Sequence, residues 1–174
     1  MKNKLRKEAI EKRKNIACEK LNKKIIANLT EIKEYKESKN IICYYPLKGE
    51  ADTRVLFDNQ LKNWYLPRVN GIFLDICPCS CLQKGSFGIM EPQTEKIKNY
   101  SEINMVIIPA CAVDRKGYRL GWGKGYYDRF LPLLPENCKK VVLIYSSLVY
   151  DTVFPEKFDV KADIIVTDTE ILRI

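Results

Sequence analysis

Four of the eight glycines lie within nine residues, among cationic side chains, in the segment GYRLGWGKGYYDR (residues 117–129). These four are Gly117, Gly121, Gly123 and Gly125. Such glycines let backbone amides approach a ligand closely and adopt positive φ. A helix beginning behind them would add free N–H groups and a positive dipole end. With Arg119, Lys124 and Arg129 close in sequence, the segment predicts a phosphate-binding loop; the alternative is a tight structural loop.

The same segment differs from the common nucleotide-binding motifs. Lys124 is followed by Gly125 instead of Ser or Thr, so this is not a Walker A loop, and Tyr126 stands where GxGxxG needs its third glycine. Asp128 follows the tyrosine pair. A carboxylate beside bound phosphates commonly holds Mg²⁺, because the ion bridges both groups. The alternative is a first-turn acid stabilised by the helix dipole.

The composition removes several kinds of catalytic site. The chain has no histidine, which excludes Ser-His-Asp and Cys-His nucleophiles and HExxH zinc sites. The seven cysteines are an odd number without an export signal, so we expect reduced thiols in a cytoplasmic protein. Cys77, Cys79 and Cys81 are spaced by two with no second cysteine pair, so no zinc site is expected.

Positive charge is concentrated near the N-terminus. Residues 1–24 contain ten Lys or Arg and three Glu, so they carry seven of the eight net positive charges. Such a segment favours anionic partners, namely nucleic acid, a membrane surface or phosphorylated and carboxylated small molecules; the alternative is a solvated helix face. No apolar run approaches the ~18 residues of a membrane span, and the N-terminus lacks the apolar region of a secretory signal.

Hydrophobic periodicity predicts the elements that must hold these residues. Residues 2–36 predict one long helix, with a break near Asn28, and a helix is expected from Asp52 or Thr53 to about Leu61. Residues 64–67 and 71–76 predict two strands around an Asn70-Gly71 turn, and residues 77–99 a loop. Residues 126–134 predict a short helix. Continuous apolar runs predict buried strands at 41–45, 105–110, 141–145 and 163–167.

Together these elements predict an α/β fold. The 174 residues are expected to form a single three-layer domain, with a mostly parallel central sheet, helices on both faces and a long N-terminal helix. In open sheets of this kind, ligands bind beyond the carboxyl ends of the strands. The loops after Tyr45 and Ala110 are therefore the places where we expect a site.

Several segments resemble one protein family. VIIPACAVDRKGYRLGWGKGYYDRFL (residues 106–131) closely resembles the signature of the 5-formyltetrahydrofolate cyclo-ligases, also called methenyltetrahydrofolate synthetases. Weaker similarities follow in the family's order at residues 2–8, 44–53, 66–69, 87–92 and 161–168. The chain departs from the family's usual residues at Val113, Trp122 and Phe158; Phe158 replaces a histidine found in many members, so any role of that histidine is absent here.

The resemblance implies an activity. It implies ATP- and Mg²⁺-dependent conversion of 5-formyltetrahydrofolate to 5,10-methenyltetrahydrofolate, with release of ADP and phosphate. Phosphorylation of the formyl oxygen would give an iminium phosphate, which the neighbouring folate nitrogen attacks. Such phosphoryl transfer needs positioning and charge neutralisation more than a nucleophilic side chain, so a protein without histidine can supply it. A cytoplasmic monomer is expected, with no nucleic-acid or membrane partner.

The resemblance also implies residue roles. Arg119 and Lys124 would be catalytic, and Asp128 and Asp163 would hold Mg²⁺. The residues implied to contact ATP are Lys2, Asn3, Lys4, Leu5, Arg6, Arg119, Leu120, Gly121, Trp122, Gly123, Lys124, Gly125, Tyr126 and Tyr127. Those implied to contact folate are Tyr45, Glu50, Trp122, Gly123, Lys124, Gly125 and Tyr126.

The residues by themselves leave alternatives open. Glu50 follows a predicted strand and could bind the pterin's N–H groups, or it could be a surface acid. Tyr45 and Trp122 could stack on a pterin or pack as ordinary aromatic residues. Two other functions compete with the cyclo-ligase: another phosphate-handling small-molecule kinase, and a single-stranded nucleic-acid-binding module built from the basic helix and the aromatic residues. No RRM, KH or OB pattern supports the second.

Overall fold

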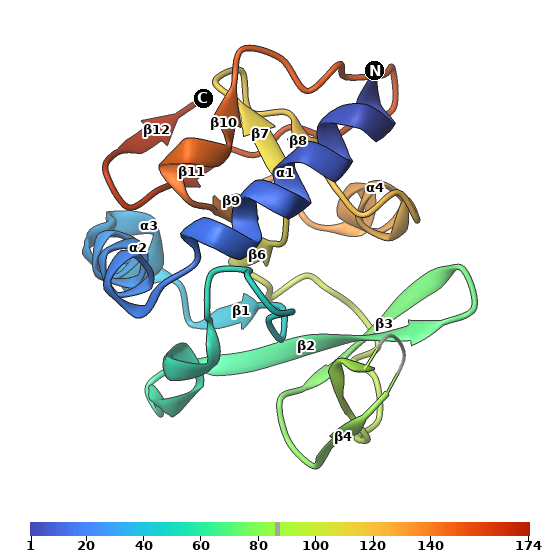
Figure 1. Cartoon of the computed structure of the whole chain (residues 1–174). Helices are drawn as coiled ribbons and strands as arrows, with labels where there is room; N and C mark the ends of the chain where they lie inside the picture. The colour runs from blue at the N-terminus through green and yellow to red at the C-terminus, as the bar shows by residue number, and fades with distance from the viewer. Residues whose placement is uncertain (86–87) are drawn as a thin grey trace.

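A seven-stranded sheet in the order β12-β11-β9-β6-β1-β2-β3 forms the centre of the fold (Figure 1). The computed structural model describes residues 1–85 and 88–174. The strands β1, β2, β6, β9 and β11 run parallel, whereas β3 and β12 pair antiparallel at the two edges. The strand bounds are β1 Asn40–Ile42, β2 Asn63–Asn70, β3 Phe73–Pro78, β6 Met105–Ile108, β9 Lys139–Leu143, β11 Ile164–Val166 and β12 Ile171–Arg173.

The central strands are the continuous apolar runs of the sequence. Ile41, Ile107 and Val142 lie on neighbouring strands and are fully buried. Strands covered on both faces need apolar side chains at every position, so such runs favour the middle of a parallel sheet. The observed strands are shorter than the predicted ones, because the last residues of the runs at 41–45 and 105–110 already belong to the loops that follow.

Two smaller sheets lie beside the central one. One contains β7 (Ala112–Asp114), β8 (Arg119–Leu120) and β10 (Val149–Tyr150). The other pairs β4 (Leu82–Lys84) with β5 (Met90–Pro92). The prediction of a loop over residues 77–99 was therefore wrong in part. Strands of two or three residues carry too little periodicity to be recognised, and the backbone hydrogen bonds of a partner strand define them.

The predicted N-terminal helix is divided into three. These helices are α1 (Lys2–Ile16), α2 (Glu19–Glu31) and α3 (Lys33–Glu37), so the break near Asn28 was wrong. Leu5 is buried in α1 and Ile25 in α2. In one straight helix of ~100° per residue, these two positions would face directions about 200° apart. The break between α1 and α2 lets both apolar faces pack on the protein, and it needs neither glycine nor proline.

Two other helices are shorter than predicted. The segment after Thr53 forms a 3₁₀ helix at Arg54–Asp58, and the Thr53 hydroxyl donates to the Tyr44 carbonyl oxygen instead of capping the helix. The helix α4 spans Tyr126–Phe130 and continues as a 3₁₀ turn at Leu131–Leu133. A further 3₁₀ turn covers Ser146–Leu148. The β2–β3 hairpin is confirmed, with its tip at Gly71 and Ile72, one residue later than predicted.

The order in which the chain adds strands to the sheet reverses between the parallel neighbours β1 and β6. From β1 the chain crosses to β2 on one side, whereas from β6 it continues to β9 and β11 on the other. Loops that leave such a switch point diverge, which opens a crevice beyond the carboxyl ends of the two strands. The predicted mixed α/β fold with a large, mostly parallel sheet and an N-terminal helix is confirmed. Within residues 1–85 and 88–174, no helix is long and apolar enough to cross a membrane.

Candidate functional site

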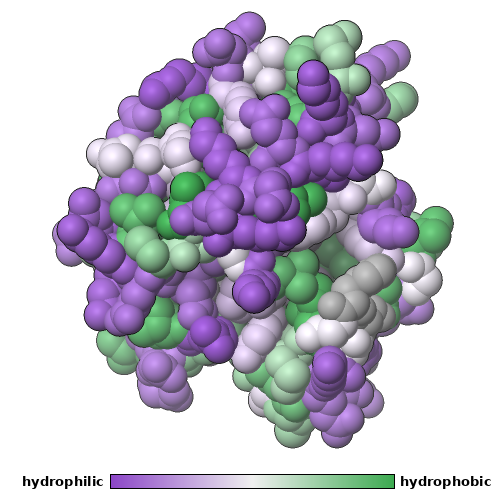
Figure 2. Space-filling model, viewed as in Figure 1, coloured by the Kyte–Doolittle hydropathy of each residue, from purple (hydrophilic) through white to green (hydrophobic). Residues whose placement is uncertain are grey.

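A cavity of about 740 Å³ opens at this switch point. Figure 2 shows it as a hollow with apolar side chains beneath the hydrophilic surface of the molecule's upper half. The loops after β1 and β6 both contribute to its wall, as the sequence predicted. The lining residues are Ile10, Arg13, Lys14, Tyr44, Tyr45, Leu47, Lys48, Glu50, Pro67, Val69, Ile89, Glu91, Pro109, Trp122, Gly123, Lys124, Gly125, Tyr126, Tyr127 and Asp128.

The carboxylate of Glu50 lies at the centre of one wall and is buried. Its Oε2 atom accepts a hydrogen bond of 2.9 Å from the backbone N–H of Leu47, and its Oε1 atom accepts one of 3.1 Å from the indole N–H of Trp122. Burial raises the pKa of Glu50, whereas these donors and the nearby Arg13 oppose the rise. The sequence alternative of an exposed surface acid is therefore wrong.

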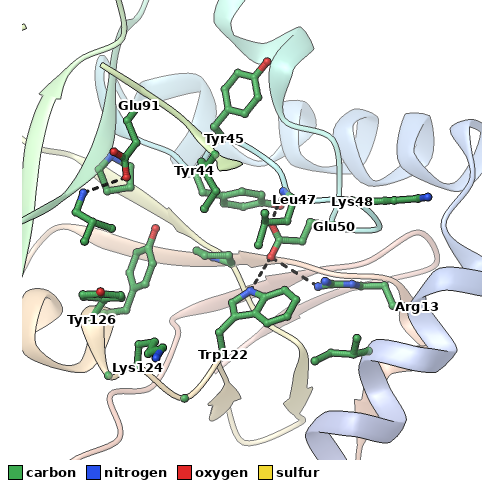
Figure 3. A pocket seen from close by; sticks show the side chains of 18 of the residues that line it. Arg13, Tyr44, Tyr45, Leu47, Lys48, Glu50, Glu91, Trp122, Lys124 and Tyr126 are labelled. Carbon is green, nitrogen blue, oxygen red and sulfur yellow. Dashed lines mark hydrogen bonds and ion pairs between the residues drawn. The ribbon is translucent and has the colours of Figure 1, made fainter. Parts of the chain in front are cut away.

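Arg13 supplies the positive charge beside this carboxylate. Its Nη1 atom lies 3.6 Å from Oε1 of Glu50, and its guanidinium carbon lies 4.9 Å from the centre of the Trp122 ring (Figure 3). The arginine is only 3% exposed. The sequence counts it only among the ten Lys and Arg of residues 1–24, for which an anionic partner and a solvated helix face were both open. Its spacing of four from Ala9 and eight from Leu5 is the signal in the sequence that places it on the buried stripe of α1.

Aromatic side chains form much of the remaining wall. Tyr45 packs on Phe57 with ring centres 6.5 Å apart, and Trp122 stays 39% exposed despite its contacts with Arg13 and Glu50. Tyr126 faces the cavity from the start of α4 (Figure 3). A flat, partly polar ring system suits a pocket of this kind, because aromatic faces stack on it while the buried carboxylate accepts its N–H groups.

The glycine-rich segment forms the opposite side of the cavity. Gly123 and Gly125 have φ of +91° and +68°, and both line the cavity beside Lys124. Gly117 lies instead in the turn between β7 and β8. A Cβ at this position would lie 2.8 Å from the Ala162 carbonyl oxygen. Gly117 thus belongs to a structural turn and Gly123 and Gly125 to the cavity wall, whereas Gly121 belongs to neither set. Phosphate binding by this segment stays a prediction.

Contacts with the β2–β3 hairpin hold this segment in place. The Nε–H of Arg129 donates to the Ile72 carbonyl oxygen at 2.9 Å, and its Nη2 atom donates to the Lys124 carbonyl oxygen at 2.8 Å. The α4 helix behind the glycines has only five residues, so its dipole is smaller than the sequence suggested. Positive side chains and backbone geometry, more than a long helix, make this wall suitable for anions.

Arg119 lies behind the wall and not on it. Its Nη2 atom donates to Oδ1 of Asp128 at 2.7 Å, and its Nη1 atom donates to the Val160 carbonyl oxygen at 2.7 Å. Its strand neighbour Leu120 is buried in the core. Among the described residues, neither Arg119 nor Leu120 lines the cavity, whereas Asp128 does. The geometry therefore points Arg119 at a carboxylate that faces the cavity.

Asp163 is not brought together with Asp128. It precedes β11, at the amino end of the parallel strands, and its Oδ2 atom accepts a hydrogen bond of 2.7 Å from the backbone N–H of Lys140, at the corresponding end of β9. The cavity lies beyond the opposite, carboxyl ends. In the part of the chain that the structure describes, no group of three or more His, Cys, Asp or Glu could hold a metal ion.

Of the predicted N-terminal contacts, Arg6 reaches the glycine-rich segment, and among the described residues none of the five lines the cavity. The Nε–H of Arg6 donates to the Gly121 carbonyl oxygen at 2.8 Å, and its Nη1 atom donates to Asn3 at 2.6 Å. Lys2 pairs with Asp159 at 2.8 Å. Of the remaining two residues of this set, Lys4 is exposed and Leu5 packs in the core.

Glu91 is a further cavity residue that the sequence did not reveal. It is buried, and its Oε1 atom accepts from the Val69 N–H at 3.2 Å. A Cβ at Gly85 would lie 2.0 Å from its Oε2 atom, so the glycine makes room for this carboxylate. Lys48, which is exposed at the rim, was missed as well. Nothing in their local spacing distinguishes either residue from surface charge.

Comparison with known proteins supports one family. The model of the "5-formyltetrahydrofolate cyclo-ligase family" matches residues 1–168. The solved structure of the 5,10-methenyltetrahydrofolate synthetase of Aquifex aeolicus superposes with a TM-score of 0.88 at 37% identity, covering 99% of this chain and 92% of that one.

Curated relatives agree. The 5-formyltetrahydrofolate cyclo-ligase of Mycoplasma pneumoniae is 28% identical over 96% of this chain and 98% of its own length. The match to the Haemophilus influenzae enzyme of the same name is 35% identical and spans 56% of this chain and 58% of that protein. With the family model matching nearly the whole length, the chain belongs to the 5-formyltetrahydrofolate cyclo-ligase family.

Proposed function

We propose that this protein catalyses the ATP- and Mg²⁺-dependent cyclisation of 5-formyltetrahydrofolate to 5,10-methenyltetrahydrofolate, with release of ADP and phosphate. One observation carries the proposal: a single cavity joins a buried carboxylate among aromatic rings to a lysine flanked by glycines with positive φ. The first wall suits a pterin and the second suits phosphates. Phosphoryl transfer between two substrates requires both to meet in one cavity.

Glu50 would orient the folate. A pterin presents its amino group and a ring N–H along one edge, and a carboxylate accepts both. Tyr45, Trp122 and Tyr126 would flank the ring plane from loops on both sides of the cavity. The glycines at 123 and 125 would let the backbone approach the reacting end of the folate and the phosphates of ATP.

Lys124 would neutralise charge on the phosphoryl group as it is transferred. Arg6 donates to the Gly121 carbonyl oxygen, and Asn3 holds the same guanidinium, which supports a nucleotide contact beside the glycine-rich segment. Lys2 would join it from its ion pair with Asp159. Arg119 would act by holding Asp128 in place. The remaining implied ATP contacts are Lys4, Leu5, Leu120, Gly121 and Tyr127; of these, the burial of Leu5 and Leu120 leaves only their backbone for such a role.

Asp128 fits a magnesium site. Its side chain is 38% exposed at the cavity, and one oxygen is fixed by Arg119. Mg²⁺ is usually bound by one or two carboxylates together with substrate phosphates and water, so one carboxylate suffices. The ion would supply charge neutralisation between the phosphates. Asp163 is not included, because it lies at the amino ends of the strands.

The chemistry follows from this arrangement. The formyl oxygen on the folate attacks the γ-phosphorus of ATP, the bond to the ADP oxygen breaks, and an iminium phosphate forms. The second folate nitrogen then attacks the activated carbon and loses its proton, and phosphate leaves with the former formyl oxygen and can take up that proton. The protein would hold the two substrates in line, exclude water and neutralise the transferred charge, which accounts for most catalysis of phosphoryl transfer.

The test is the growth of methenyltetrahydrofolate absorbance from 5-formyltetrahydrofolate, with ATP and Mg²⁺ supplied together and separately. Turnover is expected only when both are present. Equal turnover without nucleotide, or none with all components, would refute the proposal. ADP release that needs a different acceptor would favour the small-molecule kinase. We also propose that the protein is a cytoplasmic monomer. Sedimentation with and without substrates tests its oligomeric state.

A further inference from the structure

Arg13 is a buried cation on α1 that the reaction described above does not use. Building on the proposed function, we propose that Arg13 is a positioning residue for folate: it keeps Glu50 charged and in place without occupying the oxygen positions that the pterin needs. It would thereby determine folate binding while touching neither the formyl group nor the phosphates.

Three side chains from distant parts of the chain form a closed triangle. Arg13 faces Glu50 at 3.6 Å and lies 4.9 Å from the Trp122 ring centre, and the Trp122 N–H donates to Glu50 at 3.1 Å. Figure 3 shows the three converging on one side of the cavity. The arginine side chain is 3% exposed and the glutamate side chain 5%, so water screens their attraction little.

The distance between the charges is informative. At 3.6 Å, the Arg13 Nη1 atom attracts the carboxylate but makes no hydrogen bond to it, and this buried nitrogen has no hydrogen-bond partner among the described residues. Each carboxylate oxygen has about two acceptor positions. Leu47 and Trp122 take one position on each oxygen, which leaves the others for two pterin N–H groups.

Arg13 is the cation that acts on the charge of Glu50, together with the hydrogen bonds from Leu47 and Trp122. Burial raises the pKa of Glu50, and Arg13 is the cation that lowers it. Tyr44, Tyr127 and Cys111 also face this carboxylate, and burial raises their pKa values, so they stay uncharged near neutral pH. Without Arg13, Glu50 would take up a proton more readily, and the protonated acid is a poorer acceptor.

The loop that carries Glu50 is built around the arginine. Gly49 has a φ of +87°, and a Cβ there would lie 3.3 Å from Nε of Arg13. The glycine allows the guanidinium to lie directly against the backbone before Glu50. The guanidinium is thereby held between the backbone at Gly49 and the Trp122 ring, beside the carboxylate of Glu50.

The experiment compares Arg13→Met and Arg13→Lys with Lys7→Met, which removes an exposed charge from the same helix away from the cavity. Steady-state ADP release is measured from pH 6 to 9, with the rate without enzyme subtracted. Arg13→Met should raise the KM for 5-formyltetrahydrofolate by about tenfold, change the KM for ATP by less than about twofold, and move the acid limb of kcat/KM for folate to higher pH. Lys7→Met should match the wild type.

Arg13→Lys separates charge from shape. It should keep the acid limb near its wild-type position, because the charge remains, yet still raise the KM for folate, because an ammonium group does not match the planar guanidinium. If Arg13→Met does not fold, the acid limb and the KM for folate of Arg13→Lys test the inference instead. Equal losses for both substrates, or an unmoved acid limb in folded Arg13→Met, would overturn the inference. Absence of wild-type turnover would instead refute the proposed function.

Discussion

The guanidinium of Arg119 is fixed on one side by the Val160 carbonyl oxygen and on the other by Oδ1 of Asp128, each at 2.7 Å. The arginine side chain is 4% exposed and the aspartate side chain 38%. The pair therefore reaches from the protein interior to the cavity, and only its acidic end is accessible to a ligand. An arginine within a glycine-rich segment suggests a direct phosphate contact. Here, however, Nη1 and Nη2 of Arg119 already donate hydrogen bonds within the protein.

Asp128→Asn tests whether this carboxylate binds Mg²⁺. Asparagine keeps an oxygen for Arg119 but loses the charge, so we expect the fold to persist with a loss of about 1 kcal/mol. Activity should fall at limiting Mg²⁺ and recover in part at high Mg²⁺, because a neutral ligand binds the ion weakly. Asp163→Asn is the matched control, and its Mg²⁺ dependence should equal that of the wild type. A normal rate of Asp128→Asn at limiting Mg²⁺ would make its role structural.

The glycines at 121 and 125 should respond differently to alanine. Gly125 has a φ of +68°, and a Cβ there would lie 2.8 Å from Arg129 Nη1. The left-handed conformation costs about 1–2 kcal/mol for a residue with a Cβ, so Gly125→Ala should lower Tm by roughly 2–8 °C. Gly121 has no such φ and nothing within 4 Å of a built Cβ, so Gly121→Ala should melt within about 2 °C of the wild type. Thermal unfolding followed by circular dichroism measures both, and equal shifts would show that positive φ is not the cause.

Lys124 should matter more than the lysines farther along the N-terminal segment. Lys124→Ala removes a cation from the cavity and should reduce kcat by at least about a hundredfold. The lysines at 20, 23 and 24 are exposed on α2, outside the cavity, and replacing Lys20, Lys23 and Lys24 together should leave kcat within about twofold. Similar losses in both variants would mean that the whole basic surface binds ligand, and would favour nucleic-acid binding.

The cysteines should divide by reactivity. Burial raises the pKa to about 12 for Cys43, about 11 for Cys111 and about 12 for Cys138, and the thiolate is the reactive form. Cys18 and Cys81 are exposed. A thiol reagent at pH 8 should label these two first, with the buried cysteines reacting only after unfolding, as peptide mass spectrometry will show.

The cysteines at 77, 79 and 81 should bind no zinc. Elemental analysis should find no stoichiometric zinc in the protein. One zinc per chain that is lost in Cys79→Ser would contradict this.

The sequence predicted the central strands and the glycine-rich segment, because both depend on the residue types within a short stretch of chain. The central strands could be recognised because burial on both faces demands runs such as those around Ile41, Ile107 and Val142. The glycine-rich segment was found for a similar reason, since positive φ is favourable at few residues other than glycine. The helix break after α1 was missed because it depends on which surfaces Leu5 and Ile25 cover.

The candidate site was predictable only in part, because its polar side chains depend on distant partners. Glu50 is buried by Arg13 and by Trp122, 72 residues later. Arg13, for which the sequence left a solvated helix face open, is 3% exposed and lines the cavity. Asp163 is the opposite case: its residue type suits Mg²⁺, but strand direction places it at the amino ends of the strands, away from the cavity.

The position of α1 also affects how the chain folds as it is synthesised. Arg6 contacts a carbonyl 115 residues later, and Lys2 pairs with an aspartate 157 residues later. During translation, α1 leaves the ribosome before its partners, which follow 115 residues later at Gly121 and 157 residues later at Asp159. The helix lacks these contacts until then, so its junction with the glycine-rich segment forms after the strands β1, β2, β3 and β6 have been synthesised.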